Sequence, residues 1–209
     1  MPGTTSNQRT IASYERIARG YAASTAGTPS GVSEAGLRRL AAEAGSDGVV
    51  LELGSGPGWD ADFVESLGPQ VRRTDVTRAF RDLQAERGRY VEMLDAITDP
   101  YVDGEHPSYD AVMALCVLLH LERRDVDAVL AKVAGALRPD GVFLVSVREG
   151  WGDLWEHGDS GNAYFVTLWQ EEAFLARLRG VGLEPVWSAH GLSGDEAWLT
   201  VLARVRVTP

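Results

Sequence analysis

Short apolar runs alternate with amphipathic stretches along most of the chain. Each run ends at Gly, Pro, Asp or a helix signal, which is the pattern of short strands between helices. The predicted strands are Gly48–Leu53, Gln70–Asp75, Arg89–Leu94, Tyr109–Leu115 and Gly141–Val147. This alternation predicts an α/β fold in which helices cover both faces of a mostly parallel sheet.

The clearest helical pattern covers Asp125–Leu137, where apolar residues recur at i, i+3, i+4, i+7 and i+11 from Val126. Pro139 and the following Asp-Gly end this helix and turn the chain. Further helices are predicted over Arg9–Ala23, Ser33–Ala44, Asp60–Leu67 and Gln170–Arg179. After the fifth strand, and before the helix at Gln170–Arg179, we expect a loop rich in Gly and aromatic residues at Gly150–Trp169. The last strands are predicted at Leu183–Ala189 and Ala197–Val205, the second of them antiparallel.

Composition narrows the class of protein. With 209 residues, 44% of them hydrophobic and 24% charged, we expect one globular domain over residues 1–209. No apolar run reaches the roughly 20 residues of a membrane span, and the first residues lack a secretory signal, so we expect a cytoplasmic protein. A formal net charge of −10 argues against nucleic acid and membrane as partners. The single cysteine, Cys116, excludes an intrachain disulfide.

A strand, a glycine turn and a helix start follow one another in VVLELGSGPGW at residues 49–59. Glycines there let the backbone turn tightly and a ligand approach closely, and the helix N-terminus favours an anionic group. A dinucleotide site needs G-x-G-x-x-G, but Trp59 stands where its third glycine would fall. Glu52 also suits a ligand with a cationic amine better than a pyrophosphate. A pyridine-nucleotide oxidoreductase and a turn without any ligand remain as alternatives.

The segment ELGSGPG at residues 52–58 resembles the first motif of the class I S-adenosylmethionine-dependent methyltransferases, small-molecule type. Further matches in the family's order are Asp75 at the second strand end, Asp95 after VEML, YDAVMALCVLLHL at residues 109–121, and ALRPDG at residues 136–141. The resemblance implies a three-layer Rossmann-like fold with seven strands in the order 3-2-1-4-5-7-6, strand 7 being antiparallel. It also implies S-adenosylmethionine as cofactor, S-adenosylhomocysteine as product, and no metal.

The resemblance implies roles for individual residues. Glu52 would orient the methionine amine, the turn at residues 54–58 its methionyl end, Asp75 the ribose and Asp95 the adenine. A carboxylate is a natural acceptor for ribose hydroxyls, although Asp75 could instead cap a helix and Asp95 could be a solvated loop residue. The expected cofactor-binding residues are Tyr14, Tyr21, Glu52, Gly54, Ser55, Gly56, Gly58, Asp75, Val76, Leu94, Asp95, Ala96, Leu115 and Cys116.

His120 is the candidate for catalysis, because it follows the fourth strand at the edge where open α/β sheets bind ligands. It could move a proton, position the acceptor, or have only a structural role. Residues 1–45 are expected to form a helical lid that carries Tyr14 and Tyr21, and residues 148–169 a substrate-recognition loop. The candidate substrate residues are Trp59, Arg148, Trp151, Trp155, His157 and Tyr164. The alternative is a solvated loop that its Trp residues pin to the core.

We therefore expect an enzyme that transfers a methyl group to an O or N nucleophile of a small-molecule acceptor by in-line displacement. The nearest alternative is a peptide or protein N-methyltransferase with the same cofactor site, and a non-catalytic cofactor-binding module is less favoured. The sequence leaves open whether the protein is a monomer or a homodimer.

Overall fold

The computed structural model describes residues 4–158 and 161–206. Its helices are α1 (Ser6–Ser24), α2 (Gly31–Ala44), α3 (Trp59–Ser66), α4 (Arg78–Ala85), the 3₁₀ helix η1 (Leu118–His120), α5 (Arg123–Ala136) and α6 (Glu171–Gly180). Its strands are β1 (Val49–Leu53), β2 (Gln70–Thr74), β3 (Tyr109–Ala114), β4 (Leu137–Glu149), β5 (Asp153–His157), β6 (Ala163–Trp169), β7 (Leu183–Ser193) and β8 (Glu196–Val205). Within these ranges no helix is long and apolar enough to cross a membrane.

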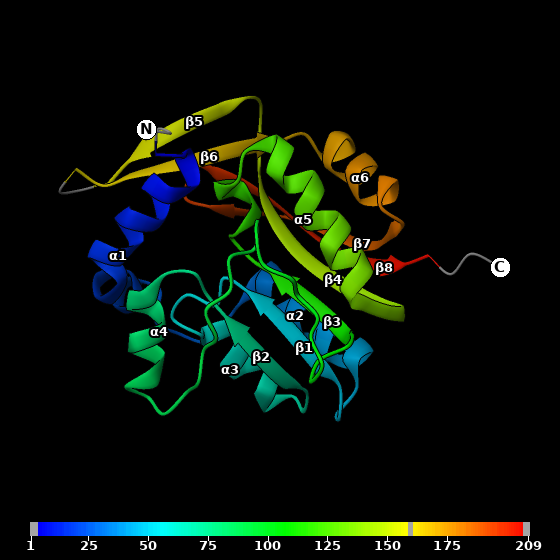
Figure 1. Cartoon of the computed structure of the whole chain (residues 1–209). Coiled ribbons are helices and arrows are strands. Elements are labelled where there is room, and N and C mark those ends of the chain that lie inside the picture. The colour runs from blue at the N-terminus through cyan, green and yellow to red at the C-terminus, as the bar shows by residue number, and fades with distance from the viewer. Residues whose placement is uncertain (1–3, 159–160, 207–209) are drawn as a thin grey trace.

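The central sheet has parallel neighbours β2, β1, β3 and β4, followed by β8 and β7, which pair antiparallel (Figure 1). On the far side of β2 the chain makes one parallel bridge, between Thr74 and Glu92. With this bridge in the position of predicted strand 3, the order is roughly the predicted 3-2-1-4-5-7-6. The sheet differs from the prediction because β6, with β5 beside it, also pairs with the end of β4. The expected α/β fold is confirmed, including the antiparallel last strand.

The predicted strand Arg89–Leu94 is wrong as a strand, because only its Glu92 reaches β-bridge geometry. The Glu92 amide donates to the Arg73 carbonyl, and the Glu92 carbonyl accepts from the Asp75 amide. This segment is the edge of the sheet, with Tyr90 and Met93 facing solvent at 83% and 57% exposure. Within residues 4–158 and 161–206, no strand pairs with the outer side of this segment.

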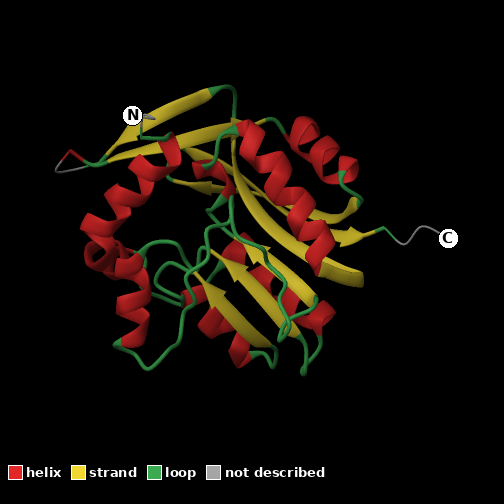
Figure 2. Ribbon diagram, in the orientation of Figure 1, coloured by secondary structure: helices red, strands yellow, loops and turns green. Residues whose placement is uncertain are grey.

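The segment predicted as a loop at residues 150–169 contains a β-hairpin instead. Strands β5 and β6 pair antiparallel, with Trp155 opposite Phe165 (Figure 2). Cross-strand aromatic pairs stabilise such ribbons, and Val166 and Trp169 anchor β6 in the core at 0% and 1% exposure. The run AYFVTLW has the composition of a strand, but its glycine-rich surroundings obscured this signal.

Alternate residues of the central strands face two separate cores. On one face, Leu51 of β1 and Phe143 of β4 pack with α5 and α6. On the other face, Val50 and Leu144 pack with α2 and α3. The period of two in the strands therefore gives the three layers seen in Figure 1.

Helix α2 approaches the sheet closely at Gly36. A Cβ placed there would come within 3.0 Å of Leu144 Cδ1, so glycine lets the helix lie directly on β4. The predicted lid at residues 1–45 thus contains two different parts: α2 packs on a sheet face, and α1 lies at the edge where the parallel strands end.

Replacing Leu144 by alanine tests how much of the stability depends on this contact. The side chain is fully buried, so we expect Leu144→Ala to lower the free energy of unfolding by about 2–5 kcal/mol. The matched control is Leu192→Ala, which removes a side chain that is 80% exposed and should change stability by about 0.5 kcal/mol or less. Urea denaturation of both variants measures the difference, and equal losses would contradict this assignment of the core.

Candidate cofactor and acceptor site

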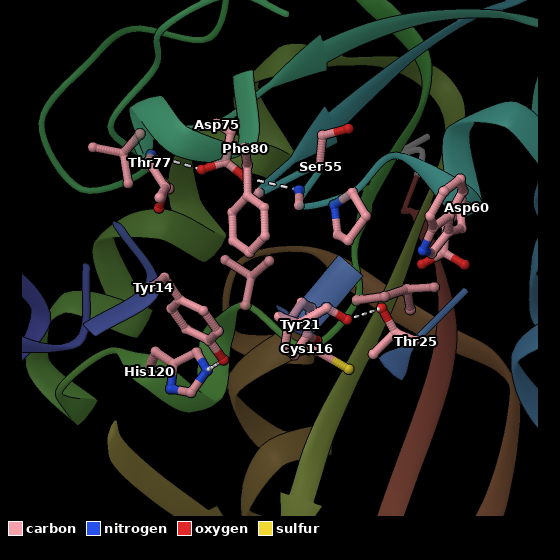
Figure 3. Close-up of a pocket in the computed structure, with 18 of the residues that line it drawn as sticks. Tyr14, Tyr21, Thr25, Ser55, Asp60, Asp75, Thr77, Phe80, Cys116 and His120 are labelled. Carbon is pink, nitrogen blue, oxygen red and sulfur yellow. Dashed lines mark hydrogen bonds between the residues drawn. The ribbon is translucent and has the colours of Figure 1, made fainter. Parts of the chain in front are cut away.

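A cavity of about 470 Å³ lies at the carboxyl ends of β1, β2 and β3. This is the edge at which open α/β sheets bind ligands, and the volume is in the range of small-molecule pockets. Its floor is the glycine turn after β1, and its cover is α1 with the segment that joins α1 to α2. Figure 3 shows side chains from both parts converging on the same space.

The three glycines of the turn have different physical reasons to be glycine. Gly54, Gly56 and Gly58 have φ angles of 67°, 53° and 85°, which other residues rarely adopt. A Cβ on Gly54 would lie 2.6 Å from a Val117 methyl, and one on Gly58 would lie 2.4 Å from Gln84 Oε1. A Cβ on Gly56 would meet no protein atom within 4 Å. Because Gly56 lines the cavity, the space in front of it is left open for a ligand.

A buried polar network holds this turn from below. The Gln84 amide, at 0% exposure, donates to Ser55 Oγ at 2.8 Å and to the Gly56 carbonyl at 2.9 Å. Arg73 donates to Gln84 Oε1 at 2.9 Å and forms ion pairs with Asp62 and Glu65 on α3. The network joins β2, α3 and α4 to the turn, so the cavity floor is fixed before any ligand binds.

Asp75 connects the turn to the next βα unit. Its Oδ2 accepts the Gly56 amide hydrogen and its Oδ1 accepts that of Thr77, each at 2.7 Å. The side chain lines the cavity, and each carboxylate oxygen has capacity for a further hydrogen bond. Asp75 therefore combines a structural role with a surface that a diol could use.

Asp95 lines the cavity at the end of the bridge segment. Its Oδ1 accepts from the Ile97 amide at 2.8 Å, and its own amide donates to Asp99 Oδ2 at 2.8 Å. Lys132 fixes the same loop by donating to the carbonyls of Ala96, Ile97 and Asp99. Asp95 is thus held in a defined loop that faces the cavity.

Two carboxyl groups near the turn have different positions. Glu52 is 4% exposed and does not line the cavity, and its Oε2 has no hydrogen-bond partner. Burial raises its pKa to about 8. Asp60, at the start of α3, lines the cavity, and burial raises its pKa to about 6 (Figure 3). The sequence analysis missed Asp60, although its place directly after the glycine turn was a usable signal.

Helix α1 is held over the cavity by contacts at both of its sides. Glu15 accepts the amide hydrogens of Arg78 and Ala79, so that α1 caps the N-terminus of α4. On the other side, Ser13 Oγ donates to the Ala163 carbonyl of β6 at 2.8 Å. The cover is therefore attached both to the core and to the hairpin.

An aromatic cluster closes the cavity beneath α1. Tyr14 lies with its ring centroid 5.5 Å from Tyr21, 5.7 Å from Phe80 and 5.1 Å from Tyr164. The Tyr14 hydroxyl is 2.9 Å from His120 Nε2, the contact drawn in Figure 3. His120 Nδ1 is 2.8 Å from the Phe165 carbonyl oxygen. Burial raises the pKa of Tyr14 and lowers that of His120. Both groups are consequently uncharged at neutral pH.

Cys116 has a φ of 57°, an uncommon backbone conformation for a residue with a side chain. Its amide donates to Ser146 Oγ at 2.9 Å, which holds the strained residue in place at the end of β3. Enclosure in the cavity raises the pKa of the thiol to about 11, so it is protonated at neutral pH. The thiol presents a neutral surface to the cavity rather than a nucleophile.

The structure brings most of the predicted cofactor residues to one place. The cofactor candidates that line the cavity are Tyr14, Tyr21, Gly54, Ser55, Gly56, Asp75, Val76, Leu94, Asp95, Ala96, Leu115 and Cys116. Glu52 and Gly58 do not line the cavity. His120 and Trp59 also line the cavity. Their roles in binding and catalysis stay predictions.

Most predicted substrate residues lie on or near the hairpin, outside the cavity. Arg148 forms ion pairs with Glu156 and Glu196, and Trp151 is 78% exposed. The other three also belong to the hairpin. The Trp155 ring lies under Arg9 and meets Phe165 edge-on, His157 is at an exposed strand end, and the Tyr164 ring lies 6.5 Å from that of His120. Within the described residues, no group of three or more His, Cys, Asp or Glu side chains is arranged to hold a metal ion.

The buried Glu52 carboxyl gives a test that needs no ligand. An unfolded chain loses this proton near the ordinary pKa of 4.5, whereas the folded protein keeps it until about pH 8. Raising the pH between these values therefore favours the unfolded state. We expect Glu52→Gln to remove this effect, so its stability relative to the parent protein should increase from pH 5 to pH 8 in urea denaturation. The control is Glu86→Gln at an exposed site, and a pH-independent difference for Glu52→Gln would contradict the assignment.

Comparison with known proteins agrees with this geometry. Residues 51–143 match the family model of a methyltransferase domain. A search of curated proteins found no match. Among solved structures, the chain resembles the Burkholderia thailandensis 1,6-didemethyltoxoflavin-N1-methyltransferase, with bound 1,6-didemethyltoxoflavin and S-adenosylhomocysteine. The TM-score is 0.70 at 22% identity, over 99% of this chain and 93% of that one.

Two further structures show the same fold. The CcbJ methyltransferase from Streptomyces caelestis has a TM-score of 0.74 at 18% identity, over 95% of this chain and 99% of that one. The [4+2]-cyclase SpnF has a TM-score of 0.71 at 17% identity, over 99% and 98%. The resemblance seen in the sequence is thereby confirmed: the chain has the class I S-adenosylmethionine-dependent methyltransferase fold, and its residues 51–143 match a methyltransferase domain.

Proposed function

We propose that the protein binds S-adenosylmethionine in this cavity and methylates an O or N nucleophile of a small molecule. One observation carries the proposal: the open space in front of Gly56 is continuous with Asp75 and Asp95 in a single cavity of about 470 Å³. A glycine turn that leaves room for a ligand, with two carboxylates at neighbouring strand ends, fits a nucleoside that also carries an amino-acid end.

The residues present fit the parts of this cofactor. Asp75 offers its free lone pairs to the ribose hydroxyls, and Asp95 offers a carboxylate oxygen to the adenine amino group. Leu94 and Cys116 supply apolar surface to the same cavity. When bound, S-adenosylmethionine supplies an electrophilic methyl group on a sulfonium. The protein orients this group toward the acceptor and excludes water beneath α1.

Asp60 is the better candidate for the methionine ammonium group than Glu52. It lines the cavity, whereas Glu52 lies behind the turn with an unpartnered oxygen. A cation beside Asp60 would favour its ionised form and offset the cost of its burial. Glu52 would then support the turn from the rear through its neighbour Ser55.

The attachment of the cover at two sides supports a small acceptor rather than a peptide. Helix α1 is attached to α4 through Glu15 and to β6 through Ser13, so the space beneath it is bounded on two sides. A peptide would need an open groove along this edge. Among the similar structures, the B. thailandensis N1-methyltransferase holds a small molecule, 1,6-didemethyltoxoflavin. The cyclase SpnF shares the fold, so methyl transfer is proposed on the cavity and not on the fold alone.

Calorimetric titration with S-adenosylhomocysteine tests the proposal. We expect binding by the parent protein and a loss of at least about 10-fold in affinity for Gly56→Ala, because the added methyl occupies the ligand space. The control is Gly88→Ala, which introduces a similar strain at φ 74° with no protein atom near its Cβ, outside the cavity. Undetectable binding by the folded parent protein at millimolar ligand would overturn the proposal.

The same titration separates the two candidate carboxylates. Loss of a charge-assisted hydrogen bond costs about 1.5–3 kcal/mol, so we expect Asp60→Asn to weaken binding by roughly 10- to 150-fold. Glu52→Gln should change the affinity by less than about 3-fold if it acts only behind the turn. The reverse order of effects would return the ammonium contact to Glu52.

A further inference from the structure

Residues from three separate parts of the polypeptide are joined by two consecutive hydrogen bonds. Tyr14 comes from the covering helix α1, His120 from η1 after β3, and Phe165 from strand β6 of the hairpin. The distances are 2.9 Å from Tyr14 Oη to His120 Nε2 and 2.8 Å from His120 Nδ1 to the Phe165 carbonyl oxygen. Tyr14 and His120 both line the cavity.

The direction of this chain follows from the chemistry of its last member. A backbone carbonyl can only accept a hydrogen bond, so Nδ1 of His120 must carry the proton. Burial lowers the pKa of His120 and keeps the ring neutral, which leaves Nε2 without a proton. Tyr14 must then donate its hydroxyl hydrogen to Nε2. The hydroxyl oxygen of Tyr14 keeps lone pairs that can accept a hydrogen bond from a molecule in the cavity.

We propose that Tyr14 and His120 form a proton relay that receives the proton lost by the acceptor during methylation. The proposal deepens the function proposed above and rests on it. It assigns to Tyr14 the contact with the acceptor and to His120 the final proton, held at Nε2. The acceptor class is accordingly a hydroxyl or N–H compound, because tertiary amines and thioethers have no proton to give.

The transfer balances in atoms and charge. As the acceptor O or N gains its bond to the methyl carbon, the bond from that carbon to the donor sulfur breaks, and the electron pair stays on sulfur in S-adenosylhomocysteine. The acceptor's bond to hydrogen breaks as well, and that proton passes to Tyr14 Oη. The original Tyr14 hydroxyl proton moves to His120 Nε2, and the ring becomes an imidazolium. Burial raises the pKa of Tyr14, so the tyrosine passes the proton on without a lasting phenolate. The positive charge of the methyl donor disappears as that of the imidazolium appears, so the cavity keeps the same net charge.

The two charged groups near His120 have opposite effects on its pKa. Glu156 on β5 raises the pKa of His120, and Arg148 on β4 lowers it, while these two residues pair with each other at 2.9 Å. Tyr164 faces both rings from β6, with its centroid 6.5 Å from His120. Desolvation remains the largest influence and holds the imidazole neutral until a proton arrives.

The relay exists only when α1 is docked. His120 and Phe165 belong to the core and the hairpin, but the hydroxyl that faces the cavity belongs to the cover. The helix that covers the cavity therefore also supplies the hydroxyl of the relay.

Histidine-ring nitrogen NMR tests the geometry without an acceptor. On ¹⁵N-labelled protein near pH 7.5, long-range ¹H–¹⁵N spectra report the tautomer of each ring. His120 is assigned by exclusion with His106→Asn, His157→Asn and His190→Asn. We expect a neutral His120 with the proton on Nδ1, and a displaced Nε2 resonance in Tyr14→Phe. An imidazolium, a proton on Nε2, or an unchanged Nε2 resonance in Tyr14→Phe would overturn the relay.

A second experiment tests whether the Tyr14–His120 relay acts during methyl transfer. It measures methylation of a panel of phenols and N–H heterocycles with labelled S-adenosylmethionine. We expect Tyr14→Phe to lower kcat by about 10²–10⁴-fold, the usual contribution of a proton-transfer group, with little change in KM. Binding of S-adenosylhomocysteine should remain, because Tyr14→Phe keeps the packed ring and removes only the hydroxyl that bonds to His120. Failure of the relay is then distinguishable from failure of the proposed function, in which the parent protein does not bind this ligand. Tyr90→Phe, at 83% exposure outside the cavity, is the control. Turnover confined to tertiary amines or thioethers, or an effect of Tyr14→Phe on KM alone, would refute the proposal.

Discussion

The two hydrogen bonds from the Gly56 and Thr77 amides to the Asp75 carboxylate fix the relation between the first two βα units. Through them, the glycine turn after β1 and the start of α4 after β2 form one rigid wall. Gln84 and Arg73 support the same wall from the interior. A buried carboxylate without hydrogen bonds is energetically costly. Moving the turn away from the start of α4 would break the hydrogen bonds of Asp75 and is therefore unfavourable. The cavity therefore has its shape in the absence of ligand.

The cover of the cavity has a different physical origin. Helix α1 contributes few residues to the two cores, and it is held by polar contacts at its sides together with the aromatic cluster around Tyr14. Glu15 satisfies amide groups at the start of α4 that would otherwise lack partners, and Ser13 and Thr10 bond to the backbone of β6. Such contacts can exchange with water more readily than apolar packing can. The floor of the cavity is thus held by a buried polar network, whereas its cover is attached by contacts to α4 and β6.

Sequence reasoning succeeded where local patterns fix the structure. The period of two in β1 and β4 and the apolar stripe of α5 predicted the layers, and the glycine turn with Asp75 and Asp95 predicted residues that share one cavity. It was wrong at the sheet edge, where Glu92 alone forms a bridge, and at residues 150–169, where a hairpin replaces the expected loop. Both errors concern pairing with a partner strand. A local pattern does not show whether such a partner is present.

The sequence by itself determined the alternation of strands and helices in the central sheet and the position of the glycine turn. These depend on backbone sterics and on periodicity within a few residues. Only the tertiary structure decided that Asp60 rather than Glu52 faces the cavity, and that Tyr14, His120 and Phe165 form one hydrogen-bonded chain. The three residues are far apart in the sequence. Their contact depends on how α1 and the hairpin pack against the core, which no local pattern contains.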